Sequence, residues 1–167
     1  MPIPHARFTV FLAFPAALVV ACGGSTSPAS PTPTPLTPAQ IQARYTAAAT
    51  HYNQGEVSIA ATENATCDAS SGSVSLSSCQ TALSSQRQLT IAYDNALRAI
   101  PFIQGAATDA AHLLGDDAAI EKLLEQAATA PAIAVIGTLQ QQIIPLLATA
   151  ATDATALRTA IGLPAPA

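Results

Sequence analysis

The chain has 167 residues, of which half are apolar but only 4% are aromatic and 10% charged, and its formal net charge at pH 7 is −4. A mildly acidic chain with few, scattered basic residues argues against binding to nucleic acid. Alanine supplies much of the apolar content, and because alanine has the best intrinsic helix propensity, this composition favours an all-helical domain.

A short basic start and an uncharged apolar run open the chain. His5 and Arg7 precede the apolar segment 8–20, which is too short for a stable membrane span and typical of a signal peptide. We therefore expect residues 1–21 to be removed from the mature protein. An ordinary secretory signal and an uncleaved anchor are the alternatives. Loss of Arg7 leaves 5 basic against 10 acidic residues, a net charge of −5.

The apolar run ends in Val19-Val20-Ala21-Cys22. These residues resemble the lipobox of bacterial lipoproteins, in which an aliphatic residue, a residue of less restricted type and a small residue precede an invariant cysteine. Leucine is commoner than the valine of Val19 at the first of these positions. The resemblance implies signal cleavage between Ala21 and Cys22 and lipidation of Cys22. Acyl chains there would anchor the mature chain to a membrane. The implied location is the cell envelope, at the outer face of the cytoplasmic membrane or at the outer membrane.

Residues 22–36 combine the cysteine with a segment rich in proline, serine and threonine and without charge. Such a segment cannot build a core, so it predicts a disordered stalk of partly polyproline-II conformation. We expect the folded domain to occupy residues 37–163, which is long enough for one hydrophobic core, and residues 164–167 to form a tail.

The domain begins with a helix-start signal. Thr37 can cap free backbone amides, Pro38 suits the first helical position, and Gln40 can complete a capping box. The pattern predicts a helix to about Asn64. Residues at four-three spacing mark one face of this helix: Ile41, Tyr45, Ala48, Tyr52, Gly55, Ile59 and Thr62.

Cys67 and Cys79 bracket a segment rich in serine, glycine and aspartate. Thiols are generally oxidised outside the cytoplasm, and acylation of Cys22 leaves these two as the only intramolecular pair, so we expect a disulfide worth about 3 kcal/mol. A redox-active pair lacks the Cys-x-x-Cys spacing that tunes thiol pKa, and two ligands make a poor zinc site.

Two further helices are expected over the next fifty residues. A capping box from Ser77 to Gln80 starts the first, whose stripe runs to Ile100 and which ends or kinks before Pro101. The second should run from about Phe102 to Ala128, with either a break or a weak point at residues 115–117. The predicted stripes are Cys79, Leu83, Gln86, Thr90, Tyr93, Leu97 and Ile100, then Ala106, Ala110, Leu113, Ile120, Leu124 and Ala127.

A last helix is predicted from Pro131, with a bend at Pro145 and a stop at Gly162. Its apolar pattern is the most regular in the chain, so we expect it to be the most buried helix. Its seam consists of Ala132, Ile136, Leu139, Ile143, Leu146, Ala150, Asp153, Leu157 and Ala160, widened by Ile133, Val135, Ile144, Leu147 and Ile161. The uncharged run 126–152 is long enough to span a membrane. The glutamines at 140–142, which would lie near mid-bilayer, favour a bundle helix.

Four helical segments with short connections predict an all-α fold: an antiparallel up-down four-helix bundle with one disulfide, preceded by a disordered stalk. The layout also resembles uncharacterised alanine-rich lipoproteins of bacterial envelopes. That resemblance implies an envelope location and brings no site motif.

Candidate chemistry is sparse, and we predict no catalytic residue, metal or cofactor. Asp109 and His112 have the spacing used in di-iron bundles, but such sites need a second copy and two more carboxylates. His51 is isolated. A group of acidic residues at helical spacing is expected to form a solvated face rather than a calcium site: Asp116, Asp117, Glu121 and Glu125.

The sequence therefore predicts a lipid-anchored, non-catalytic module that contacts an envelope protein or a cell-wall component. The alternative is a binder of a small apolar ligand between the helices. A mostly apolar pocket with a few convergent polar groups would favour the alternative, and a contiguous exposed apolar patch would favour the module.

Overall fold

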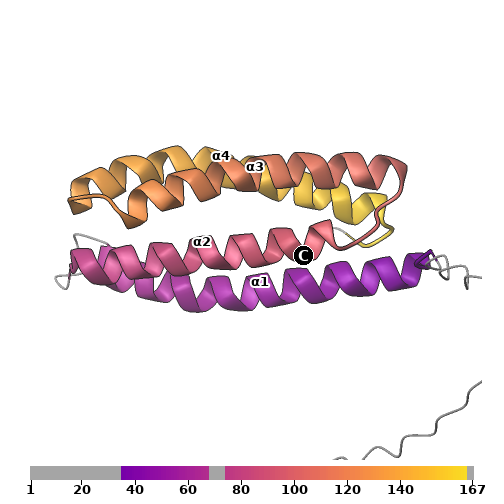
Figure 1. Cartoon of the computed structure of the whole chain (residues 1–167), viewed down its shortest axis with the longest axis horizontal. Helices are drawn as coiled ribbons and strands as arrows, with labels where there is room; N and C mark the ends of the chain where they lie inside the picture. Colours follow the sequence, from indigo (N-terminus) through magenta and orange to yellow (C-terminus); the bar gives the residue numbers. More distant parts are fainter. Residues whose placement is uncertain (1–34, 68–73, 165–167) are drawn as a thin grey trace, which may run out of the picture. The chain divides into compact units, whose positions relative to one another are not determined.

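The computed structural model describes residues 35–67 and 74–164, which form four α-helices (Figure 1). These helices are α1 (Pro38–Cys67), α2 (Leu76–Arg98), α3 (Gln104–Ala128) and α4 (Ile133–Ala160), and no strand occurs within the described ranges. The predicted all-α class is confirmed. The predicted signal peptide, the lipidated Cys22 and nearly all of the predicted stalk lie outside the described residues and stay predictions.

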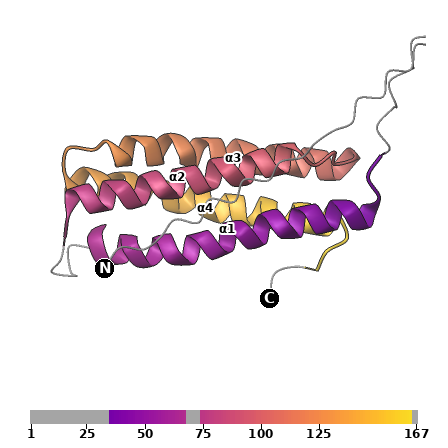
Figure 2. The same cartoon turned by 60° about the horizontal axis from the view of Figure 1, so that its bottom comes forward.

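Each helix packs against the next one along the chain, and the views show α1 alongside α2 and α3 alongside α4 (Figures 1 and 2). Side chains of α1 reach the end of α4. The Gln42 Nε2 donates a hydrogen bond to the Ile161 carbonyl oxygen at 2.7 Å, and the Tyr45 hydroxyl donates to the Ala154 carbonyl at 3.4 Å. The helices therefore form the predicted antiparallel bundle, in which α1 and α4 are joined mainly by side chains.

The predicted capping box opens α1. The Thr37 amide donates to Gln40 Oε1 at 2.8 Å, and the Gln40 amide donates to Thr37 Oγ1 at 3.3 Å. Pro38 is the first helical residue, as predicted. The helix continues past Asn64 to Cys67, where the disulfide to Cys79 joins it to the start of α2. The predicted disulfide is thus confirmed.

The stop of α4 also follows its sequence signal. Gly162 adopts a left-handed φ of 79°, its amide donates to the Thr159 carbonyl at 2.9 Å, and the Leu163 amide donates to the Arg158 carbonyl at 2.8 Å. This pair of bonds is a Schellman motif, which satisfies carbonyls at the helix end and requires a residue that tolerates positive φ.

Three helix starts differ from the prediction. Ser75, not Ser77, caps α2, because its hydroxyl accepts the Ser78 amide at 3.4 Å. The start of α3 lies at Gln104 rather than Phe102, since the chain around Pro101 has left the helix and returns only after an extended Ile103. Similarly, α4 starts at Ile133, after Pro131. Of the two alternatives predicted for residues 115–117, a break or a weak point in one helix, the break does not occur, because α3 is continuous through Gly115.

The core is centred on α2 and α3. Every predicted stripe residue of these two helices is buried, together with the connection residue Ile100. The expectation that α4 would be the most buried helix is wrong, because it buries five residues whereas α2 buries eight. Val135, Ile144 and Leu147 are 41%, 55% and 38% exposed. Because α4 packs closely only on α3, only the narrow strip of α4 side chains that faces α3 is buried.

By length and hydropathy alone α4 qualifies as a candidate membrane span. A core helix of a soluble bundle meets the same criteria, and the seam of α4 at Ile136, Leu139, Ile143 and Leu157 is buried in the core.

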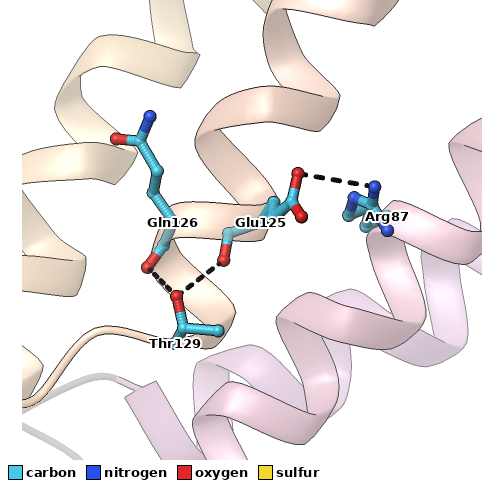
Figure 3. A network of polar contacts seen from close by, with 4 residues as sticks. All are labelled: Arg87, Glu125, Gln126 and Thr129. Carbon is cyan, nitrogen blue, oxygen red and sulfur yellow. Dashed lines mark hydrogen bonds and ion pairs between the residues drawn. The ribbon is translucent and has the colours of Figure 1, made fainter.

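A polar network links α2 and α3 at the surface (Figure 3). Arg87 Nη2 lies 3.5 Å from Glu125 Oε2, and the Thr129 hydroxyl donates to the Glu125 and Gln126 carbonyls at the end of α3. The Glu125 side chain is 63% exposed, so this ion pair contributes little to stability and Glu125 belongs to the expected solvated face.

Candidate functional site

The facing residues of α1 and α4 differ in size. On α1, Tyr45 and Tyr52 lie two turns apart on one face, whereas the opposite part of α4 carries Ala150, Ala151 and Ala154. Alanine fills little space, and the two helices are bridged rather than closely packed. A cavity of about 410 Å³ remains between them.

The floor of this cavity comes from the other two helices. Tyr93 of α2 and Leu113 and Asp117 of α3 complete it, so all three tyrosines of the chain line one cavity. The full lining consists of Tyr45, Ala49, Tyr52, Asn53, Glu56, Tyr93, Leu113, Asp117, Leu147, Ala150, Ala151, Ala154 and Arg158.

The tyrosines form a connected aromatic wall. The rings of Tyr52 and Tyr93 are tilted by 40° with centroids 4.9 Å apart, which is a favourable aromatic contact. The Tyr93 hydroxyl also interacts with Tyr45. Burial raises the pKa of Tyr52 and Tyr93, and the neighbouring Glu56 raises that of Tyr52 further. The hydroxyls of Tyr52 and Tyr93 therefore hold their protons at neutral pH.

A pair of buried carboxyl groups lies behind the wall. Asp94 of α2 is fully buried, Asp117 of α3 is only 6% exposed, and their side chains interact by a hydrogen bond. Arg98 Nη2 donates to Asp94 Oδ2 at 2.9 Å. The other oxygens, Asp94 Oδ1 and Asp117 Oδ2, are buried and have no donor among the described residues. Two carboxyl groups so placed in low-dielectric surroundings must share a proton or be balanced by a cation.

Burial, followed by the charge of Asp94, raises the pKa of Asp117 to about 8. Burial also raises the pKa of Asp94, although its contacts with Asp117 and Arg98 act in the opposite direction. At neutral pH the pair therefore keeps one proton. The expectation that Asp117 belongs to a solvated face is wrong, because it lies on the buried stripe between Leu113 and Ile120.

A polar layer extends from the pair towards the surface of α1. Gln86 Nε2 donates to Glu56 Oε1 at 3.4 Å, and the Thr90 hydroxyl donates to the Gln86 carbonyl at 3.2 Å. The Tyr52 hydroxyl interacts with both Glu56 and Thr90. The side chain of Tyr52 thus connects the cavity with this layer.

The residues that the sequence offered for metal chemistry do not converge. His51 and His112 are exposed, and Asp109 is only partly buried. Asp116 interacts with Asp153 of α4, and its pKa is raised by burial and by that carboxyl group. Among residues 35–67 and 74–164, no group of three or more His, Cys, Asp or Glu side chains is placed to hold a metal ion.

Sequence reasoning missed the carboxyl pair although a signal for it was present. Asp117 lies four residues after Leu113 and three before Ile120, which is the spacing of the core stripe, and Asp94 stands likewise between Thr90 and Leu97. A charged residue at a core position is rare unless it is paired, so both positions marked a polar site inside the bundle.

Comparison with protein-family models, with curated proteins and with solved structures finds no match to this chain.

Proposed function

We propose that this chain is a lipid-anchored protein of the cell envelope whose helical bundle binds a small molecule between α1 and α4. The observation that supports binding is the cavity: its volume of about 410 Å³ falls within the range of small-molecule sites. Its walls combine alanine, leucine and tyrosine with a few polar groups, and this composition is also that of ligand pockets.

The proposed role is binding rather than catalysis. The lining residues include no serine, cysteine, histidine or lysine, and in this proposal the tyrosine and carboxyl groups of the wall hold the ligand. The raised pKa values of Tyr52 and Tyr93 further make their hydroxyls poor bases at neutral pH.

A pair of matched substitutions on α4 tests the cavity. Ala151→Phe places a large ring in the cavity wall, whereas Ala148→Phe places the same ring at another exposed position that does not line it. A ligand that binds only the folded state raises its stability. We expect the small-molecule fraction of a bacterial envelope extract to raise the unfolding midpoint of wild type and Ala148→Phe but not of Ala151→Phe. An equal rise in both variants would place the ligand elsewhere.

The anchor is tested separately. Labelled palmitate should enter the wild-type chain expressed in bacteria and should not enter Cys22→Ala, because the acyl chain requires the thiol. Equal labelling of the two chains would refute lipidation at this position.

The second candidate is the interaction module, and it is supported by exposed apolar side chains on α4. Ile144 and Leu147 lie one turn apart and are 55% and 38% exposed. We expect Ile144→Ser to weaken cross-linking to an envelope partner, whereas Val57→Ser at a 75% exposed position on α1 should not. Identical cross-linking patterns for wild type and both variants would remove this candidate.

A further inference from the structure

Acidic side chains predominate around the middle of the cavity. Asp117 and Glu56 both line it, and both raise the pKa of the Tyr52 hydroxyl. The charged groups that act most strongly on Asp117 are themselves acidic: Asp94, Glu121 and Asp116. The only basic lining residue, Arg158, donates from Nε to the Pro164 carbonyl at 3.1 Å.

One oxygen of the Asp117 carboxyl group has no donor among the described residues. This atom, Oδ2, is buried and accepts no hydrogen bond within the described chain. Arg98, the nearest basic partner of the carboxyl pair, bonds to Asp94 instead. Once this carboxyl group loses its proton, no basic group among the described residues bonds to it, so a positive charge on a ligand would stabilise its ionised form.

The aromatic wall fits the same kind of ligand. The faces of tyrosine rings attract cations, and two or three such rings beside a carboxylate are the usual surroundings of a bound ammonium group. Tyr52 and Tyr93 are in ring contact, and Tyr45 continues the wall along α1. Leu113 and the alanines of α4 leave apolar space for the rest of the ligand.

We infer that the cavity binds an organic cation, namely an amine or quaternary ammonium compound whose charge lies against Tyr52 and Tyr93 with Asp117 as its counter-ion. The inference rests on the proposed function of the cavity and names the class of its ligand.

Binding of such a cation is coupled to a proton. The protonated Asp117 carboxyl group must release its proton to solvent when a cation replaces it, so one proton leaves for each cation bound. The groups that face the carboxyl pair are Arg98 and Tyr93 from α2, Asp116 and Glu121 from the helix of Asp117 and Tyr52 with Glu56 from α1, while α4 contributes Arg158 to the lining. Two of these side chains are basic: Arg98 bonds to Asp94, and Arg158 donates to the Pro164 carbonyl. Affinity should therefore rise with pH, by up to about ten-fold per pH unit while Asp117 remains protonated in the free protein.

Three benzyl probes of similar size separate charge from shape: benzyltrimethylammonium, benzyl alcohol and benzoate. They are titrated calorimetrically into the mature chain, purified from bacterial membranes in a neutral detergent, at pH 6.5 and pH 8.5. We expect the cation to bind at least about ten-fold more tightly than the alcohol at the higher pH, and benzoate to bind most weakly. The preference for the cation should shrink at the lower pH.

Asp117→Asn keeps the shape of the protonated side chain but cannot become a counter-ion. It should bind benzyl alcohol as wild type does, while the preference for benzyltrimethylammonium and its pH dependence are lost. Asp109→Asn removes the same charge from α3 at a position that does not line the cavity, and it should behave as wild type.

The outcomes distinguish the ligand class from the function. If benzyl alcohol binds as tightly as the cation, or if the preference survives in Asp117→Asn, the inference about cations is overturned while binding in the cavity stands. If none of the three probes binds wild type, the proposed function of the cavity is overturned as well.

Discussion

Replacing Asp117 by asparagine should change how stability depends on pH. In the folded chain the pKa of Asp117 is raised to about 8 from an ordinary value of 3.8, mainly by burial and then by Asp94. Between these two values the folded state holds a proton that the unfolded state has lost. The free energy of unfolding therefore falls as pH rises through this window.

The slope follows from linkage. One proton held only by the folded state corresponds to a loss of up to about 1.4 kcal/mol for each pH unit. Asparagine stays neutral at every pH and can donate its amide to Asp94, which then ionises beside Arg98. Asp117→Asn should consequently gain stability relative to wild type as pH rises from about 5 to 8, and the gain should level off above the pKa of Asp117.

Glu63 contributes a smaller effect of the same sign. Burial, followed by Glu56, raises the pKa of Glu63 to about 7. Glu63→Gln should therefore remove only the fall in unfolding free energy that occurs below about pH 7. The double variant with Asp117→Asn should show the smallest change of unfolding free energy with pH.

The assay is urea denaturation followed by far-UV circular dichroism at unit steps from pH 5 to pH 9. Urea is uncharged and leaves the electrostatic interactions unscreened. If wild type and Asp117→Asn show parallel stability profiles, Asp117 is not protonated in the folded state, and the buried pair with a shared proton is wrong.

Three further outcomes can be checked with the same denaturation assay at one pH. Leu139→Ala deletes a buried side chain and should cost roughly 2–5 kcal/mol, whereas Gln141→Ala at an exposed position should cost under about 0.5 kcal/mol; equal effects would contradict the orientation of α4. Gly115→Ala should stabilise the protein by about 0.5–1 kcal/mol, because an added Cβ meets nothing within 4 Å. Gly162→Ala should destabilise the protein by about 1–2 kcal/mol, because alanine is strained at the left-handed φ of this position. Stability changes of the same sign for both variants would contradict these backbone conformations. Replacing both disulfide cysteines by serine should cost about 3 kcal/mol, and an unchanged unfolding midpoint would show that the crosslink does not constrain the unfolded chain.

The helices and the disulfide could be predicted because their signals are local. The capping box at Thr37 and the glycine stop at Gly162 need only neighbouring residues, and both formed as expected. The buried stripes of α2 and α3 could be predicted because each of these helices packs against two neighbours. The helix α2 contacts α1 and α3, and α3 contacts α2 and α4, so the whole apolar stripe of each is covered. The cap of α2 was misplaced because several serines around Ser75 offer equivalent oxygens, and local sequence cannot choose among them.

The exposure of α4 could not be derived from periodicity. An apolar seam shows which face a helix buries, but the width that is buried depends on how many helices cover it. Ile144 and Leu147 widen the seam in sequence, yet they are exposed because α1 is bridged to α4 by long side chains such as Gln42 rather than packed on it.

The same loose contact explains why the cavity escaped sequence analysis. Tyrosines on α1 and alanines on α4 each fit a helix face when considered alone, and only their juxtaposition leaves space. Asp117 was assigned to solvent because it is charged and adjacent to Asp116, although its spacing from Leu113 places it in the core. A bundle stabilised by apolar packing alone would favour leucine at that position. If the proposed cation reaches Asp117 through the cavity, it offsets part of the cost of burying two carboxyl groups side by side, a cost that the shared proton and Arg98 offset in the free protein.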